Sequence, residues 1–154
     1  IWEIPIVTVF ILYGPSMAVA VSVINTLALL VLFPGALPTG PLYNLAAVLG
    51  MLVGIYIAHL MTKRRPPNEN FTKLSLLATG LGIFFRVTVM TSVNWAFIRY
   101  PPPVGFSMPE EAILAILPLV AFFNATLALY TIPAGYILAR AVSSGVKIGL
   151  WKPS

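Results

Sequence analysis

The chain alternates long apolar runs with short stretches that contain proline, glycine or charge. Five such runs stand out, at residues 4–13, 16–33, 42–61, 74–98 and 112–142. A helix rises about 1.5 Å per residue, so roughly 20 apolar residues cross the hydrocarbon core of a bilayer. The first run covers only about 15 Å as a helix, and Gly14-Pro15 separates it from the second. It is either a short helix shielded by its neighbours or the bent start of a longer one.

The composition places these runs in a membrane. Of 154 residues, 59% are hydrophobic and only 8% are charged, and the mean hydropathy is +0.96. A soluble domain normally carries about a quarter charged residues. We therefore expect an all-α integral membrane protein, a compact polytopic helix bundle that forms a single transmembrane domain over residues 1–154. The chain has no cysteine, which excludes disulfides and thiolate metal sites.

Charge at the ends of the runs predicts the orientation. When the spans alternate, seven of the nine Lys and Arg residues fall on one side: Lys63, Arg64, Arg65, Lys73, Arg140, Lys147 and Lys152. Because positive charge marks the cytoplasmic side of a membrane protein, we expect the loop at residues 62–73 and the C-terminus to be cytoplasmic. The Pro-rich connectors at residues 34–41 and 99–111 then face outward.

One cation interrupts the fourth run. Arg86 lies near its middle, and no acid is close to it along the chain. A central Arg costs about 2.5–3.5 kcal/mol on insertion scales, so it should face the bundle interior or a wet cavity. Met90 and Asn94 follow at i+4 and i+8, which places all three on one helical stripe. Arg86 either contributes to binding or braces the bundle.

Further polar and aromatic residues lie at similar levels of other runs. Asn44 is near the outer end of the third run and Asn124 is deep in the last one. Amide groups suit a neutral, hydrogen-bonding solute, although they also join helices structurally. Tyr43 and Trp95 lie near the outer ends, where they fit either an interfacial aromatic belt or a stacking surface for a ring.

Missing motifs argue against enzymatic activity. The chain has no GxxxxGK[ST] sequence, no HExxH and no Asp-rich magnesium motif, so neither ATP hydrolysis by a P-loop nor intramembrane metal chemistry is expected. We place its four acids at ends or in loops, which would leave no carboxylate inside the membrane: Glu3, Glu69, Glu110 and Glu111. We expect a protein that is not an enzyme and has no cofactor.

Four motifs occur in an order that is similar to a known family. They are "IPIVTVFILYGP", "TGPLYNLAAVLGM", "FFRVTVMTSVNW" and "LPLVAFFNATLA". The chain resembles the S components, the substrate-binding membrane subunits of energy-coupling factor (ECF) vitamin transporters, and most closely the riboflavin type. The motifs match the second to sixth helices of that family. The resemblance implies a six-helix S-component fold of which five spans are visible here, the first helix being absent from this sequence.

The resemblance also implies a function. The chain would be a subunit of a prokaryotic plasma membrane that takes up riboflavin or a related flavin. Its pocket would open outward, and its partners would be a transmembrane coupling subunit, two ATPase subunits and the lipid bilayer, with no nucleic acid. The implied ligand contacts are hydrogen bonds from the three amides, ring contacts from two aromatics, and the Arg86 stripe: Asn44, Asn94, Asn124, Trp95, Tyr43, Met90 and Arg86.

Alternatives to a flavin carrier stay open. Leu127 stands three residues after Asn124, where riboflavin-type members commonly have Lys, so another vitamin is the first alternative. A structural subunit of a larger membrane complex, without a ligand, is the second. A channel is weaker, because no ring of charges or filter-like Gly/Thr run is present. We also expect the small-residue faces Gly50/Gly54 and Ala18/Ala20 to let the protein slide against a coupling subunit.

Overall fold

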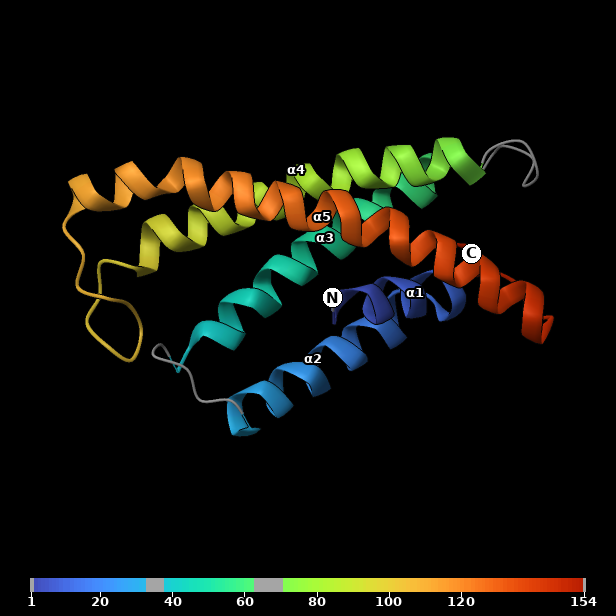
Figure 1. Ribbon diagram of the computed structural model, residues 1–154, viewed down its shortest axis with the longest axis horizontal. Coiled ribbons are helices and arrows are strands. Elements are labelled where there is room, and N and C mark those ends of the chain that lie inside the picture. The colour runs from blue at the N-terminus through green and yellow to red at the C-terminus, as the bar shows by residue number, and fades with distance from the viewer. Residues whose placement is uncertain (1, 33–37, 63–70, 154) are drawn as a thin grey trace.

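The computed structural model describes residues 2–32, 38–62 and 71–153. Within these ranges the chain forms five helices and no strand (Figure 1). The helices are α1 Glu3–Tyr13, α2 Pro15–Leu32, α3 Gly40–Thr62, α4 Phe71–Phe97 and α5 Glu110–Val146. Four of them, α2 to α5, are long and apolar enough to cross a membrane. The chain is therefore consistent with a helical multi-pass membrane protein, and each predicted apolar run forms one helix.

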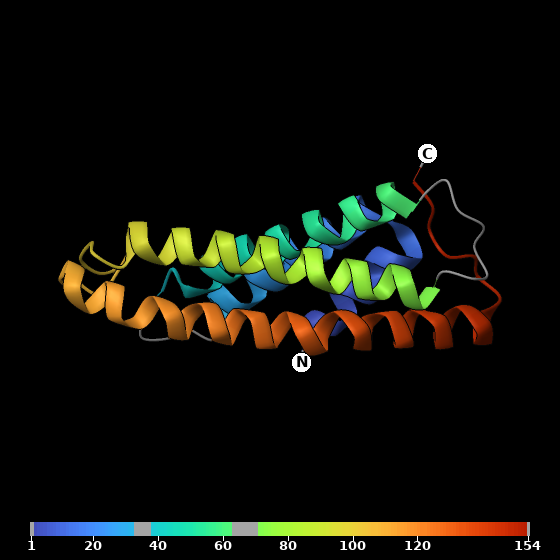
Figure 2. The same cartoon turned by 90° about the horizontal axis from the view of Figure 1, so that it is seen from above.

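The bundle has two distinct ends. The end of α3, the start of α4 and the end of α5 lie together, near the C-terminus (Figure 2). We call this the tail end, and we call the opposite end, where α4 and α5 are joined, the loop end. Lys73, Arg140, Lys147 and Lys152 belong to the tail end, as the predicted alternation of spans requires. The other three basic residues of the predicted cytoplasmic loop, at positions 63–65, lie outside the described residues.

The first helix is a separate short helix, and it is the most enclosed one. Gly14 has φ +92°, a conformation that L-residues rarely adopt, and it ends α1. Ile6, Val7, Phe10 and Ile11 on α1 are almost completely buried. Neighbouring helices therefore shield a segment that is too short to cross a bilayer. Figure 1 shows α1 starting near the middle of the bundle's length, with its other end toward the tail end.

The contact between α3 and α4 depends on glycine. A Cβ added at Gly54 would lie 2.5 Å from the carbonyl oxygen of Leu81, and one added at Gly50 would lie 2.9 Å from Val89 Cγ2. Only glycine allows the two backbones to approach this closely. The expectation that Gly50 and Gly54 form a sliding face for a partner is wrong, because α4 of the same chain covers both.

The longest helix passes through two prolines without interruption. α5 has 37 residues and includes Pro118 and Pro133 in its interior. At about 1.5 Å per residue its length is roughly 55 Å, which exceeds the thickness of the hydrocarbon core. Figure 2 shows α5 extending along the whole bundle. It therefore contributes side chains to both ends.

The C-terminal tail packs against the last turn of α1, which lies at the tail end of the bundle. The backbone N–H of Trp151 donates to the carbonyl of Ile11 at 2.9 Å. The indole ring meets Phe10 edge-on, with 5.6 Å between ring centroids, and lies 5.7 Å from the His59 ring. Trp151 also lies directly beside Gly14, where a Cβ would be 2.6 Å from its Nε1. The C-terminal tail therefore packs on the turn between α1 and α2.

We expect Trp151→Ala to lower the free energy of unfolding by about 2–4 kcal/mol, because a packed indole is removed from an aromatic cluster. Thermal unfolding in detergent measures this. Trp95→Ala is the matched control, since Trp95 is half exposed, and its loss should cost less than about 0.5 kcal/mol. Equal losses for the two variants would show that the tail is not part of the folded core.

Candidate functional site

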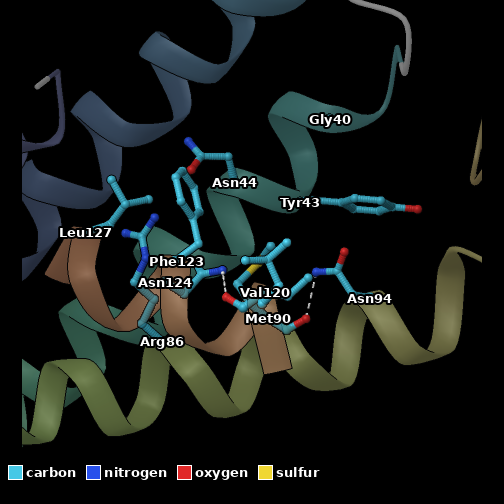
Figure 3. A pocket seen from close by; sticks show the side chains of 11 residues that line it. Gly40, Tyr43, Asn44, Arg86, Met90, Asn94, Val120, Phe123, Asn124 and Leu127 are labelled. Atoms are coloured by element: carbon cyan, nitrogen blue, oxygen red, sulfur yellow. Dashed lines mark hydrogen bonds between the residues drawn. The ribbon is translucent and has the colours of Figure 1, made fainter. Parts of the chain in front are cut away.

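A cavity of about 440 Å³ lies between α3, α4 and α5 in the half of the bundle nearer the loop end (Figure 3). It is lined by Gly40, Tyr43, Asn44, Arg86, Met90, Asn94, Leu119, Val120, Phe123, Asn124 and Leu127. Six of the seven residues that the sequence suggested for ligand binding are in this set. The structure therefore gathers polar groups from three helices, far apart in the chain, around one mostly apolar hollow.

The predicted stripe on α4 forms one wall. Arg86, Met90 and Asn94 line the cavity at intervals of four residues. The Asn94 Nδ2 donates to the carbonyl of Met90 at 2.8 Å. This bond orients the amide, and in Figure 3 its oxygen points away from the α4 ribbon. The Oδ1 of Asn94 is thus held as an acceptor for another donor.

Arg86 forms an ion pair deep inside the bundle. Its Nη1 donates to Glu3 Oε2 at 2.6 Å and its Nη2 donates to Glu3 Oε1 at 2.9 Å. Its Nε donates to Asn124 Oδ1 at 3.0 Å. The arginine is 1% exposed and the glutamate 4%. Arg86 therefore braces α4 against α1 and α5, and it also forms part of the cavity wall.

The ion pair corrects the prediction that no carboxylate lies inside the membrane. Glu3 is in the first turn of α1, where the helix dipole favours a negative charge. It lies at the level of Arg86, which is central in α4. The sequence did contain a signal for this position. The helix α1 is about half as long as the bilayer is thick. Because one end of α1 lies at the tail end of the bundle, its other end must lie near the middle of the bilayer.

The three amides differ in their free hydrogen-bonding capacity. The Asn124 Nδ2 donates to Val120 O at 2.9 Å, while its oxygen accepts from Arg86. Asn124 is therefore mainly a positioning residue. Asn44 is half buried and makes no side-chain hydrogen bond to other described residues. Figure 3 shows its amide on the side of the Phe123 ring. Asn44 and Asn94 are thus the amides that are best placed to bind a solute.

Tyr43 connects the cavity to the connector between α4 and α5. Its hydroxyl donates to the carbonyl of Val104, and the hydroxyl of Thr39 donates to the carbonyl of Pro103 at 2.7 Å. The connector is therefore attached to the start of α3. The ring of Tyr43 still lines the cavity, and its centroid is 6.1 Å from that of Phe97.

Trp95 is not among the residues that line the cavity, and its predicted contact with a ligand ring stays a prediction. Trp95 is 46% exposed, and the Arg99 guanidinium carbon lies 4.7 Å from the centre of its ring. This cation–π pair suits a residue at the membrane interface. Phe123 on α5 lines the cavity instead. Nothing in the sequence distinguishes it from the neighbouring Phe122, because the rotation of the helix decides which of the two lines the cavity.

A second cavity, of about 580 Å³, lies between α4 and α5 nearer the tail end. Its lining includes Arg140, Tyr136 and the hydroxyl residues Thr72 and Ser75, but none of the predicted site residues. The cavity at the loop end, which six of the predicted residues line, is therefore the better candidate for a functional site. Among the described residues, no group of three His, Asp or Glu side chains could hold a metal ion.

Comparisons of the chain with models of protein families, with curated proteins and with solved structures found no match.

Proposed function

We propose that this chain is the membrane-embedded substrate-binding subunit of a vitamin uptake transporter, of the kind formed by the S components of ECF transporters. The observation that carries this proposal is the cavity at the loop end, which combines six of the residues selected for ligand binding. Riboflavin or a related flavin is the first ligand to test. Release of the solute would depend on a coupling subunit and two ATPase subunits.

The size and lining of the cavity support a small amphiphilic solute. A volume of about 440 Å³ falls within the range of roughly 300–1,000 Å³ that is typical of small-molecule sites. Met90, Leu119, Val120, Phe123 and Leu127 supply apolar surface. Asn44 and Asn94 supply a few converging polar groups. Such a site binds a flat ring by burying its faces and satisfies its polar edge with amides.

The proposed membrane orientation follows from charge. Four basic residues belong to the tail end in the described ranges, Lys73, Arg140, Lys147 and Lys152. By the positive-inside rule, that end would be cytoplasmic. The cavity, at the opposite end, would then receive its solute from outside the cell. The multi-pass protein would lie in a prokaryotic plasma membrane.

Leu127 bears on the choice of vitamin. It lines the cavity, where riboflavin-type members commonly have a Lys, and it presents an apolar surface there. This observation favours keeping a second candidate, an S component for a different neutral ring solute. Both candidates use the same cavity and differ only in the ligand.

A titration of purified protein tests the proposal. We expect riboflavin fluorescence to be quenched on addition of the protein in detergent, because the electron-rich ring of Tyr43 lies in the cavity. A thermal-shift panel of other vitamins covers the second candidate, which predicts stabilisation by one of them. If no vitamin of the panel stabilises the protein, and riboflavin is not quenched, the chain is better explained as a structural subunit.

We expect Asn94→Ala to weaken binding of the vitamin about tenfold, since one hydrogen bond contributes roughly 0.5–1.5 kcal/mol. Its folding should change little, because within the described part of the chain the lost amide bonds only its own helix. Thr126→Val is the matched control: its hydroxyl also bonds its own helix, at Phe122 O, but it lies on an exposed face. Equal affinities of the two variants would contradict a contact between Asn94 and the solute.

A further inference from the structure

We propose that Glu3 determines the charge of the solute that the cavity accepts, so that the site selects an uncharged ring compound over its phosphorylated form. This inference rests on the proposed function, and it specifies the class of substrate. Glu3 is not among the residues that line the cavity. It would act through Arg86, which does line it, and is therefore a positioning residue rather than a direct ligand contact.

The contacts between Glu3 and Arg86 show how the positive charge of Arg86 is compensated. Both oxygens of the Glu3 carboxylate accept hydrogen bonds from the two terminal nitrogens of Arg86, at 2.6 and 2.9 Å. Such a two-point contact is the strongest arrangement of this pair of groups. Arg86 also donates from Nε to the neutral Asn124. The cation is therefore compensated within the protein and has no net charge to offer a solute.

The rest of the cavity adds no charge. The ten lining residues other than Arg86 are neutral, being apolar residues, asparagines, one glycine and one tyrosine. An anion entering this cavity would lose its hydration without gaining an uncompensated positive partner, which is unfavourable. A neutral solute loses much less. The net charge beside the cavity is thus set by two residues on different helices, Glu3 on α1 and Arg86 on α4.

Glu3→Gln tests this role of Glu3, because it keeps the shape of the side chain but removes the negative charge that compensates Arg86. An uncompensated guanidinium in the cavity wall attracts a phosphate, and a hundredfold gain in affinity corresponds to about 2.8 kcal/mol. We expect the ratio of affinities for phosphorylated and neutral forms to rise by about a hundredfold. Glu3→Gln/Arg86→Gln removes both charges and should return the preference to the neutral form.

The probes are two matched pairs: riboflavin with flavin mononucleotide, and pyridoxal with pyridoxal 5′-phosphate. Dissociation constants are measured for wild type, Glu3→Gln, the double variant and the control Glu110→Gln, which removes an exposed acid. If Glu3→Gln does not fold, Glu3→Asp replaces it. Its carboxylate is one methylene further from the guanidinium and compensates the positive charge less well, so we expect a smaller shift, of about tenfold, in the same direction.

The outcomes separate this inference from the proposed function. Preference of the wild type for a neutral form, with a shift toward phosphate only in the Glu3 single variants, supports the inference. Binding of a neutral form with an unchanged ratio in those variants overturns the inference and leaves the proposed function intact. Tighter binding of a phosphorylated form by the wild type also overturns the inference alone. Failure of the wild type to bind any of the four probes or any vitamin of the thermal-shift panel contradicts the proposed function.

Discussion

Glu3→Ala is expected to lower the free energy of unfolding by about 3–5 kcal/mol, the usual cost of leaving one member of a buried ion pair without its partner. Arg86 would remain almost fully buried, 1% exposed, and its remaining acceptors among the described residues would be Asn124 Oδ1 and Met51 Sδ. The variant also removes a contact that joins α1 to α4. A large effect is therefore expected from an acid that the sequence places in the first turn of a short helix.

Thermal or denaturant unfolding in detergent measures this effect. Glu110→Ala is the matched control, since Glu110 also lies in the first turn of a helix but is exposed, and we expect it to cost less than about 0.5 kcal/mol. Glu3→Ala/Arg86→Met should be more stable than Glu3→Ala alone, because no uncompensated charge remains. Equal stability of Glu3→Ala and Glu110→Ala would contradict a buried ion pair.

Gly54→Ala is expected to destabilise the bundle by about 1–3 kcal/mol, the usual cost of overpacking a close contact. The new methyl group would be 2.5 Å from the carbonyl oxygen of Leu81 and 2.7 Å from the backbone nitrogen of Gly82. Both neighbours are backbone atoms, so a change of side-chain rotamer cannot relieve the contact. The helices α3 and α4 must move apart.

Gly80→Ala provides the matched control on α4. A Cβ at Gly80 meets nothing within 4 Å, and alanine is favoured over glycine inside a helix by about 1 kcal/mol. We therefore expect this variant to be as stable as the wild type or slightly more so. Thermal unfolding of both variants in the same detergent gives the comparison. A Gly54→Ala protein that is no less stable than Gly80→Ala would show that α3 and α4 are not in direct backbone contact.

The helices could be predicted well from the sequence because lipid restricts the options. Backbone groups in hydrocarbon must bond within the segment, so a long apolar run becomes a helix. The runs at residues 42–61 and 112–142 correspond to α3 and α5, which extend them by a few residues. Helical periodicity also placed Arg86, Met90 and Asn94 on one face, and the structure places all three on the cavity.

The tertiary partners could not be predicted in the same way. The pairing of Glu3 with Arg86 spans 83 positions and depends on how deeply α1 enters the bundle. The rotation of α5 decides that Phe123 faces the cavity, and the rotation of α4 keeps Trp95 out of it. Small residues such as Gly54 mark a close contact, but their pattern does not say whether the neighbour is the same chain or a partner.

The proposed function requires that a neutral ring solute binds in the cavity between α3, α4 and α5. Native mass spectrometry of protein purified from cells grown with a vitamin mixture detects such a solute, with Asn94→Trp as a variant that fills the cavity and Trp95→Ala as a control outside it. We expect a bound vitamin in wild type and Trp95→Ala but none in Asn94→Trp. A wild type without any bound solute, or a solute that Asn94→Trp retains equally well, would contradict it.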